Sequence, residues 1–308
     1  MEGRVLRILR FDSVVELARN IRASFRRTSG VTREAPRAPA RREVSVRRSE
    51  ETSPILPDTR TMPNFVIIGA QKCGTTFLYN LLTQHPHVEP ATKKEIHYFD
   101  RRFSKGLHWY HSHFPPRREE LSTITGESTP YYLFHPHTAR RMAQVVPEAR
   151  LITVLRNPVD RAYSHYHQEV GRGHEPLTFE EAIEAEEGRL RGEVDRMLKD
   201  EHYVSFNHQN FSYLARGIYV DQLVEWARFF GDEQLLVLKS EDLFDQTSNV
   251  LDSVLGFLGM PGWYPEVLEP CLKGSYAPMN PVTRRRLRDY FEPHNRRLYE
   301  YLGVDFGW

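Results

Sequence analysis

A short apolar run that leads directly into a glycine-containing polar turn is the feature that most constrains this chain. Phe65-Val-Ile-Ile-Gly69 is a continuous apolar segment ended by glycine, the pattern of a strand buried on both faces of a parallel sheet. A polar turn follows, and after it a helical stretch over about 75–84, which ends before Pro86. This order predicts an α/β domain with the turn at the carboxyl edge of its sheet.

The same alternation continues along the chain. Apolar runs over 150–155 and 235–239 predict two more buried strands. Pro158, near the first position of the next predicted helix, follows the first of these runs. Helical patterns also cover 137–146, 178–191, 219–230, 248–258 and 283–302. We therefore expect an α/β fold of three layers, with a central parallel sheet flanked by helices.

Charge is distributed unevenly along the 308 residues. Residues 1–60 carry a formal charge of +6 and the remaining 248 carry −5. A chain that mainly binds nucleic acid would carry its basic excess on the folded part, so this class is not expected. No apolar run approaches the ~20 residues that a transmembrane helix needs. The two cysteines, Cys73 and Cys271, are too few for a disulfide-stabilised secreted scaffold, which favours a reducing compartment.

The first 62 residues differ from the rest. In residues 1–27, apolar residues from Val5 to Ile21 recur at roughly helical spacing among five arginines. This pattern predicts either a basic amphipathic helix on an anionic membrane surface, or an arm whose arginines merely keep it solvated. Residues 28–62 are rich in Arg, Pro, Ser, Glu and Ala and are expected to be a disordered linker. The folded domain is predicted to cover 63–308.

Two groups of residues are predicted to bind phosphate groups. The turn after the first strand holds Lys72, Cys73, Gly74, Thr75 and Thr76 at the start of a helix, where backbone N–H groups bind anions. In nucleotide triphosphatases the lysine follows the second glycine of the loop, whereas here it lies two positions before Gly74, which argues against a Mg-dependent kinase or ATPase. The alternative is a tight connection without a ligand. Cys73 is expected to be a buried filler rather than a nucleophile.

The second group follows the second strand. Arg156 ends that strand, and Ser164 lies about two helical turns into the next helix. Because the carboxyl ends of parallel strands share one edge, Arg156 is expected beside the first turn, where it and Ser164 would bind a second phosphate. Taken separately, Arg156 could form a surface ion pair and Ser164 could face solvent.

These motifs resemble those of sulfotransferases. Val66–Thr76 resembles the family's 5′-phosphosulfate loop, and Leu155–Ser164 resembles its 3′-phosphate motif. Further matches resemble the heparan sulfate glucosaminyl branch: they are Lys94–Asp100, Lys105–Tyr110, Thr129–Tyr131, Arg216–Tyr219, Lys273-Gly274 and Asp305–Trp308. The resemblance covers about residues 63–308. It implies a P-loop-like α/β fold and 3′-phosphoadenosine 5′-phosphosulfate as co-substrate, without a metal.

The resemblance also implies roles for individual residues. Glu95 matches the general base of that branch, with His97 as an alternative base or a partner, and Asp100 is expected to be a cap or an ion-pair partner. Lys72 would stabilise the leaving phosphate. The resemblance implies further nucleotide-binding residues. Residues 273–277 resemble the loop that closes over the nucleotide, and Tyr219 ends the matching Arg216–Tyr219 segment; the residues expected to bind are Lys273, Gly274, Ser275, Tyr276, Ala277 and Tyr219. If 95–97 were extended, the side chains of Glu95 and His97 would face the same side.

Some features depart from the animal enzymes of that branch. No membrane anchor is expected from this sequence, Cys271 has no nearby cysteine, and Glu127-Ser128-Thr129-Pro130 lacks the lysine that several of those enzymes carry. We therefore expect a bacterial, cytoplasmic enzyme, associated with a membrane if residues 1–27 bind one. Its acceptor is a glycan, a lipid or a small metabolite, sulfated on a hydroxyl or an amine. The alternatives are a non-catalytic nucleotide-binding or scaffolding module and a nucleotide kinase.

Overall fold

The three strands predicted from the sequence pair side by side in the computed structural model, which describes residues 7–8, 62–116, 123–266 and 276–308. Among the described residues the sheet has six strands, all parallel, in the order β1-β6-β5-β2-β4-β3. Their bounds are β1 Arg7–Ile8, β2 Phe65–Gly69, β3 Val88–Pro90, β4 Ile124–Ser128, β5 Arg150–Leu155 and β6 Leu235–Lys239. Strands β2, β5 and β6 confirm the prediction.

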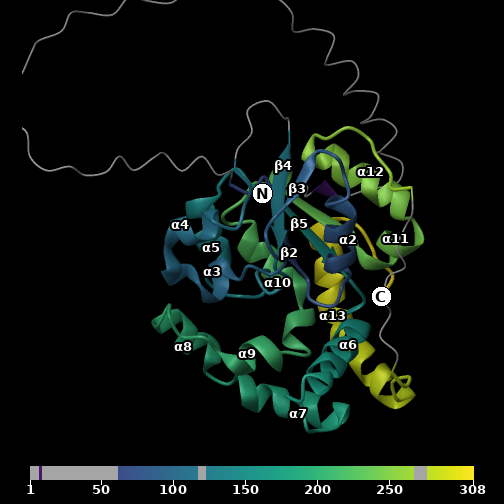
Figure 1. Ribbon diagram of the computed structural model, residues 1–308. Helices are drawn as coiled ribbons and strands as arrows, with labels where there is room; N and C mark the ends of the chain where they lie inside the picture. Colours follow the sequence, from purple (N-terminus) through teal and green to yellow (C-terminus); the bar gives the residue numbers. More distant parts are fainter. Residues whose placement is uncertain (1–6, 9–61, 117–122, 267–275) are drawn as a thin grey trace, which may run out of the picture. The chain divides into compact units, whose positions relative to one another are not determined.

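Helices flank the sheet, as the sequence predicts. Their bounds are α2 Thr75–Leu82, α3 Tyr98–Arg101, α4 Gly106–His111, α5 Thr138–Val145, α6 Pro158–Gly171, α7 Phe179–Leu190, α8 Glu193–Lys199, α9 Phe206–Asn210, α10 Tyr219–Trp226, α11 Ser240–Asp245, α12 Thr247–Leu258 and α13 Pro281–Leu302, with 3-10 turns η1 Phe103–Lys105, η2 Ala215–Gly217 and η3 Asp232–Gln234. In Figure 1, α3, α4 and α5 lie on one side of the strands, and α2, α11 and α12 lie on the other. The expected three-layer α/β fold is therefore confirmed.

Strand β4 is absent from the predicted elements because it carries polar residues. It contains Gly126 and Glu127, and each of these residues has a structural role at its position. A Cβ atom on Gly126 would lie 2.6 Å from the ring of Phe65 in the adjacent β2. Glu127 is fully buried, and its carboxylate accepts hydrogen bonds from Tyr110 at 2.7 Å and Thr129 at 2.8 Å. These hydrogen bonds make the buried carboxylate of Glu127 compatible with the core.

The start of α6 shows how local sequence sets a helix boundary. Asn157 is the N-cap residue, and its side-chain oxygen accepts a hydrogen bond from the backbone N–H of Val159 at 3.0 Å. Pro158 then takes the first helical position, where a missing N–H costs nothing. The helix that ends at Gly171 therefore starts immediately beyond the carboxyl end of β5.

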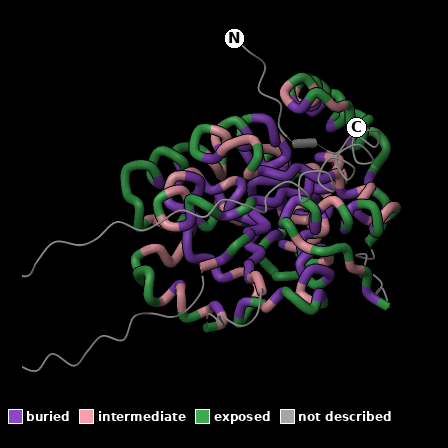
Figure 2. Tube along the Cα trace, turned by 90° about the horizontal axis from the view of Figure 1, so that it is seen from above, coloured by how far each residue is buried: buried purple, intermediate pink, exposed green. Residues whose placement is uncertain are grey.

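Two apolar clusters hold the layers together. The larger surrounds the sheet, and in Figure 2 the buried residues are concentrated along the central strands. The smaller joins α6, α7 and α13 through Val159, Ala162, Phe179, Leu287 and Phe291. It anchors α6, the helix that carries Ser164, against the body of the domain.

The N-terminal prediction differs from what is observed at two residues. Arg7 and Ile8 form β1 and pair with Leu236 and Val237 of β6, whereas the apolar spacing predicts a helix there. Backbone groups at the edge of a sheet need partners, and a short parallel strand supplies them. The remainder of the predicted arm and almost the whole predicted linker lie outside the described residues. None of the helices in the described ranges is long and apolar enough to cross a membrane.

The end of β2 gives a test of the packing. A Cβ atom on Gly69 would lie 2.6 Å from the Cβ atom of Leu133, so we expect Gly69→Ala to lower the free energy of unfolding by about 1–3 kcal/mol. The control is Gly256→Ala in α12, where nothing lies within 4 Å of the added atom. This second change should be neutral or stabilising by up to about 1 kcal/mol, because alanine is the better helix former. Urea denaturation of both variants measures the difference, and equal stabilities would contradict the packing argument.

Candidate active site

The turn between β2 and α2 depends on one glycine. Gly74 is the N-cap residue of α2 with a φ of 96°, a left-handed conformation that glycine adopts without strain. A Cβ atom at this position would also lie 3.0 Å from the ring of Phe244. The turn can therefore close tightly, and the first residues of α2, Thr75 and Thr76, lie at the wall of a cavity. Backbone N–H groups of a first helical turn have no partner within the helix, which suits them to bind an anion.

The cavity has a volume of about 920 Å³ and brings together residues from distant parts of the chain. Nine residues that the sequence predicts as site residues line it: Lys72, Gly74, Thr75, Thr76, Glu95, His97, Arg156, Ser164 and Tyr276. They come from the turn after β2, from the segment after β3, from the end of β5 with α6, and from the segment before α13. Residues spread over about two hundred positions therefore share one binding surface.

A direct hydrogen bond connects the two predicted phosphate-binding groups. The Nη1 atom of Arg156 donates to the backbone carbonyl of Lys72 at 3.3 Å. Tyr219 supports this contact from behind, since its hydroxyl donates to the backbone carbonyl of Arg156 at 2.9 Å. The side chain of Arg156 is thereby held at the turn that carries Lys72, as expected from the parallel sheet.

Two predicted residues lie behind the cavity wall rather than at its surface. Tyr219 and Cys73 are buried, and the Cys73 Sγ lies 3.9 Å from the Tyr219 hydroxyl. Burial raises the pKa of the Cys73 thiol to about 11, so the thiol is protonated at neutral pH. Both side chains support the turn and Arg156 from inside the protein.

The segment before α13 is only partly described. Tyr276 lines the cavity, where its ring stacks on His167 with centroids 4.2 Å apart. The backbone carbonyl of Ala277 accepts a hydrogen bond from the Tyr163 hydroxyl at 2.9 Å. Lys273, Gly274 and Ser275 lie outside the described residues.

Positive charge gathers around Lys72. Burial lowers the pKa of its ammonium group, and the charges of Arg172 and Arg156 lower it further. Like charges this close disfavour one another, so a bound anion would relieve the repulsion. This part of the cavity is therefore suited to a phosphate or sulfate group.

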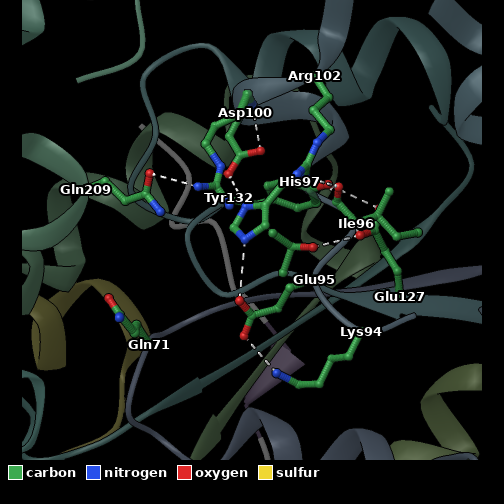
Figure 3. A network of polar contacts seen from close by, with 12 residues as sticks. Gln71, Lys94, Glu95, Ile96, His97, Asp100, Arg102, Glu127, Tyr132 and Gln209 are labelled. Carbon is green, nitrogen blue, oxygen red and sulfur yellow. Dashed lines mark hydrogen bonds and ion pairs between the residues drawn. The ribbon is translucent and has the colours of Figure 1, made fainter. Parts of the chain in front are cut away.

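Glu95, His97 and Asp100 form a chain of polar contacts (Figure 3). The Nε2 atom of His97 lies 3.4 Å from a carboxylate oxygen of Glu95, and its Nδ1 atom lies 2.6 Å from an oxygen of Asp100. Lys94 adds an ion pair with Glu95 at 2.9 Å. Asp100 is thus an ion-pair partner, as expected. Glu95 is 43% exposed while Asp100 is fully buried, so the chain of contacts runs from the cavity into the interior.

The backbone at these residues is not extended. Glu95 and His97 have φ values of 59° and 57°, and Lys72 has a φ of 70°. Among the described residues no other non-glycine residue has a positive φ. The contact between Glu95 and His97 therefore arises from two left-handed residues, and the condition of an extended segment does not apply. Strained backbone of this kind concentrates at functional sites.

The pKa values follow from these contacts. Burial would raise the pKa of Glu95, but the hydrogen bond with His97 and the charge of Lys94 outweigh it and hold the pKa at about 2. Burial would lower the pKa of His97, but its hydrogen bonds with Asp100 and Glu95 raise it above the ordinary value of 6.5. At neutral pH Glu95 is a carboxylate, and its contact with His97 favours the charged form of the imidazole.

A buried layer supports this segment. The Glu95 backbone N–H donates to the Ser128 carbonyl at 3.0 Å, and the Tyr98 N–H donates to the Tyr132 hydroxyl at 2.9 Å. Tyr132 in turn donates to the buried Glu127 at 3.3 Å. Burial raises the pKa of Glu127 to about 7. Most aromatic side chains near the site are buried in the core, although Tyr131 also lines the cavity.

Several cavity residues were not singled out from the sequence. They are Gln168, Arg172, Gln209 and Asn210, among others; Gln71 and Arg216, which also line the cavity, lie in family-like motifs but were given no role from the sequence. Gln168 and Arg172 follow Ser164 at intervals of four on the predicted helix, so the spacing could have identified them. Arg216 is fully buried and donates to Gln71 and to the backbone carbonyls of His208 and Gln209. Nothing in its sequence context indicates such burial.

No metal centre is evident in the described part of the chain, since no group of three or more His, Cys, Asp or Glu side chains there is arranged to hold an ion. The cavity instead offers ammonium, guanidinium, amide and carboxylate groups. Such groups can bind anions and accept a proton.

The pKa of His97 can be measured by NMR titration. We expect it to lie above 6.5, and Asp100→Asn to lower it, because the carboxylate stabilises the imidazolium. A raised pKa means that the pairing stabilises the fold below pH 6.5 and that this contribution is lost as the pH rises through the folded-state value. Asp100→Asn should therefore cost more stability at pH 6 than at pH 9.

His208 is the internal control for that titration. Burial lowers its pKa to about 3, so it should stay neutral from pH 5 to 9. A His97 pKa below 6.5 in the unmodified protein would contradict the described contacts.

Most of the chain matches the model of a known protein family. The model of the sulfotransferase domain matches residues 62–278. The membrane-associated sulfotransferase kil1 of Dictyostelium discoideum is 30% identical, over 80% of this chain and 66% of its own length. The heparan sulfate glucosamine 3-O-sulfotransferase 3B1 of Homo sapiens is 31% identical, over 84% of this chain and 71% of its own.

A solved structure agrees with the fold. The crystal structure of a sulfotransferase from Alicyclobacillus acidocaldarius has 31% sequence identity and a TM-score of 0.62, over 80% of this chain and 98% of that chain. The family model covers more than half of the chain, and it includes both predicted phosphate-binding groups and the Glu95 segment. The chain therefore belongs to the sulfotransferase family of group-transferring enzymes.

Proposed function

We propose that this protein transfers the sulfuryl group of 3′-phosphoadenosine 5′-phosphosulfate to a hydroxyl or an amine of an acceptor. The observation that carries the proposal is the contact between Arg156 and the Lys72 carbonyl at the wall of a cavity that Glu95 also lines. Two anion-binding groups and a carboxylate then face one space. Sulfotransferases use this nucleotide, which carries one phosphate group at the 3′ position and another at the 5′ position of its ribose.

The nucleotide would span the two groups. In this arrangement Arg156 and Ser164 bind the 3′-phosphate, and the turn from Lys72 to Thr76 binds the 5′-phosphosulfate. Tyr276, with its ring already stacked on His167, offers an aromatic face to the base. The segment from Lys273 to Ser275 and Ala277 are proposed to complete the cover over the nucleotide.

The reaction would be an in-line displacement at sulfur. The acceptor oxygen or nitrogen forms a bond to sulfur, and the bond from sulfur to the bridging oxygen of the 5′-phosphate breaks. The electron pair of that bond stays on the phosphate, where Lys72 and the backbone N–H groups of the turn stabilise the developing charge. The acceptor proton passes to a base on the opposite side of the sulfuryl group, which we assign to Glu95.

The contacts of Glu95 determine how strong a base it is. While His97 is protonated, the pKa of Glu95 is held at about 2, and a carboxylate of that pKa accepts a proton poorly. Loss of the His97 proton would remove the cationic neighbour and raise the basicity of Glu95. Turnover should therefore rise with pH through the raised pKa of His97, and Asp100 and His97 act as positioning residues for Glu95.

The names of two relatives support predictions about the location of this protein and the class of its acceptor. The Dictyostelium relative is named membrane-associated, which favours a peripheral membrane contact for this chain through residues 1–27. The human relative is named for glucosamine of heparan sulfate, which makes a glycan the first acceptor class to try. Bacterial origin and a cytoplasmic location are predictions from the sequence departures alone.

Nucleotide binding gives the first test. Calorimetry with EDTA present should detect binding of 3′-phosphoadenosine 5′-phosphate and much weaker binding of adenosine 5′-phosphate. Arg156→Ala should reduce this preference by about 2 kcal/mol, the contribution of a charge-assisted hydrogen bond. Equal affinity for the two nucleotides would contradict the assignment, and a strict Mg requirement would favour the kinase alternative.

The base gives the second test. Glu95→Gln should lower turnover about 100- to 10,000-fold, as general-base catalysis typically contributes, with nucleotide affinity nearly unchanged. Lys72→Ala should damage both binding and turnover, because Lys72 contacts the bridging region before and during the reaction. The measurement is transfer of labelled sulfate from the nucleotide to fractionated acceptors, with the product identified by mass.

His97→Ala separates the two bases. Equal losses in Glu95→Gln and His97→Ala, with matching pH profiles, would mean that the two side chains act as a unit. Near-normal turnover of Glu95→Gln beside an inactive His97→Ala would move the base to His97. Nucleotide binding without transfer to any acceptor pool would favour a non-catalytic module.

A further inference from the structure

A second, smaller cavity lies between α6 and α13. Its volume is about 230 Å³, and none of its lining residues lines the larger cavity. The two helices lie side by side (Figure 1), joined by the apolar cluster that contains Val159, Leu287 and Phe291. Asn157 and Pro281, at the amino-terminal ends of α6 and α13, both line this smaller cavity. We call it the α6–α13 pocket.

Three arginines in the first two turns of α13 line the α6–α13 pocket: Arg284, Arg285 and Arg288. Arg284 forms an ion pair with Asp160 at 2.7 Å, and Arg288 lies 3.8 Å from an oxygen of Asp289. Within the described ranges, no acidic side chain forms an ion pair with Arg285. The starts of two long helices add partial positive charge. The wall formed by α13 therefore favours an anion, and a planar guanidinium suits a carboxylate.

Polar groups without partners lie further along the same wall. Asn295 lies seven residues beyond Arg288, on the same face of α13, and lines the pocket. Asn295 is only 5% exposed, yet no hydrogen bond joins its side-chain amide to another described residue. Trp308 also lines the pocket, and in the described part of the chain its buried Nε1 atom has no hydrogen-bond partner. A buried polar group left unpaired costs about 1–3 kcal/mol, so an oxygen atom placed here would be bound.

The wall between these two ends is apolar. The fully buried ring of Phe291 lies between Arg288 and Asn295 in the sequence of α13, and Val159 of α6 also lines the pocket. At 1.5 Å per residue, the backbones of Arg288 and Asn295 lie roughly 10 Å apart along the helix. One aromatic ring with substituents at opposite ends, hydrogen-bonded at both, spans a similar length. The pocket therefore suits a flat apolar body with an anion at one end and an oxygen at the other.

We propose that the α6–α13 pocket is a second binding site, which takes a small aromatic carboxylate with a hydroxyl group on the far side of its ring. The carboxylate binds Arg285 and Arg288, and the ring packs against Phe291. The hydroxyl donates to the side-chain oxygen of Asn295 and accepts a hydrogen bond from the Trp308 indole. This site goes beyond the proposed function and does not depend on it, because the two cavities share no lining residue.

The indole N–H signal of Trp308 reports directly on the pocket. The chain has four tryptophans, so the indole region of a proton–nitrogen correlation NMR spectrum of the full chain holds few signals, and Trp308→Phe identifies the relevant one. Titration with 4-hydroxybenzoate should shift this signal until it saturates. A ligand of about ten non-hydrogen atoms should give a Kd on the order of 1 mM.

Two related ligands separate the two ends of the site. Benzoate lacks the far hydroxyl and should bind about fivefold more weakly, the contribution of a neutral hydrogen bond. The neutral 4-hydroxybenzamide keeps the hydroxyl but lacks the charge, and it should bind about tenfold more weakly than 4-hydroxybenzoate, as expected for loss of a hydrogen bond between charged groups.

Variants of the pocket should change these preferences one at a time. Arg285→Gln, at an exposed position, should weaken 4-hydroxybenzoate about tenfold and leave 4-hydroxybenzamide unchanged, because only the charge is lost. Asn295→Leu should lower the preference for 4-hydroxybenzoate over benzoate to about twofold. Arg286→Gln is the matched control: Arg286 is the next residue of α13 and pairs with Glu184 at 3.1 Å, but it does not line the pocket. This control should keep full affinity for all three ligands.

Several outcomes would overturn the site. The first is a Trp308 signal that does not move at about 20 mM 4-hydroxybenzoate. Equal affinities for 4-hydroxybenzoate and 4-hydroxybenzamide, or full affinity of Arg285→Gln, would overturn it as well, because the arginines would then not bind the carboxylate. Equal losses in Arg285→Gln and Arg286→Gln would assign the effect to the general charge of α13 and would also overturn it. None of these measurements uses the nucleotide, so each outcome leaves the proposed function unaffected.

Discussion

The parallel pairing of β2 with β5 is the constraint on which the site depends. Phe65 pairs with Arg150 and Ile67 with Ile152, so the two strands end at the same edge of the sheet. The turns that follow them are then neighbours, and a single hydrogen bond from Arg156 to the Lys72 carbonyl connects them. A one-residue slip would turn every side chain of the strand to the other face. The anion-binding groups therefore lie together only because the strands are held in this register.

The electrostatics of the site are divided between two sides. Lys72, Arg156 and Arg172 gather at the sheet edge and at α6, where their mutual repulsion favours a bound anion. On the other side, the segment that contains Glu95 supplies a carboxylate, and Lys94 and His97 balance its negative charge. In the proposed reaction, an acceptor placed between the two sides would meet Glu95 as the base and Lys72 as the group that stabilises the leaving phosphate. This separation of charge is the arrangement that a displacement at sulfur requires.

Buried polar groups keep this arrangement rigid. Asp100 fixes His97, Glu127 fixes Tyr132, and Glu169 fixes Arg172, and each of these carboxylates is buried. Taking a carboxylate out of water is costly unless hydrogen bonds compensate. Here the compensating donors are side chains at or next to the cavity, so the groups that satisfy the interior also orient the site. The left-handed backbone at Lys72, Glu95 and His97 fits the same interpretation, since the surrounding contacts must outweigh its strain.

The sequence by itself determined three neighbouring strands of the sheet, most of the longer helices and the candidate binding residues that follow the strands. Apolar runs identified β2, β5 and β6, because a strand buried on both faces must be apolar throughout. The same reasoning missed β4, because Glu127 and Gly126 break its pattern. Lys72, Gly74, Arg156 and Ser164 could be selected because position relative to a strand end is a local property of the chain.

Only the tertiary structure decided how these residues meet. The contact between Glu95 and His97 depends on two left-handed residues that no propensity predicts. Tyr219 and Cys73 are part of matching motifs, yet they lie behind the cavity wall, because which face of an element is covered depends on its neighbours. The depressed pKa of Glu95 likewise follows from Lys94 and His97 outweighing burial, and burial is a property of the folded chain. Local sequence thus specifies which groups are available, whereas distances, exposure and charge balance arise only when distant segments pack together.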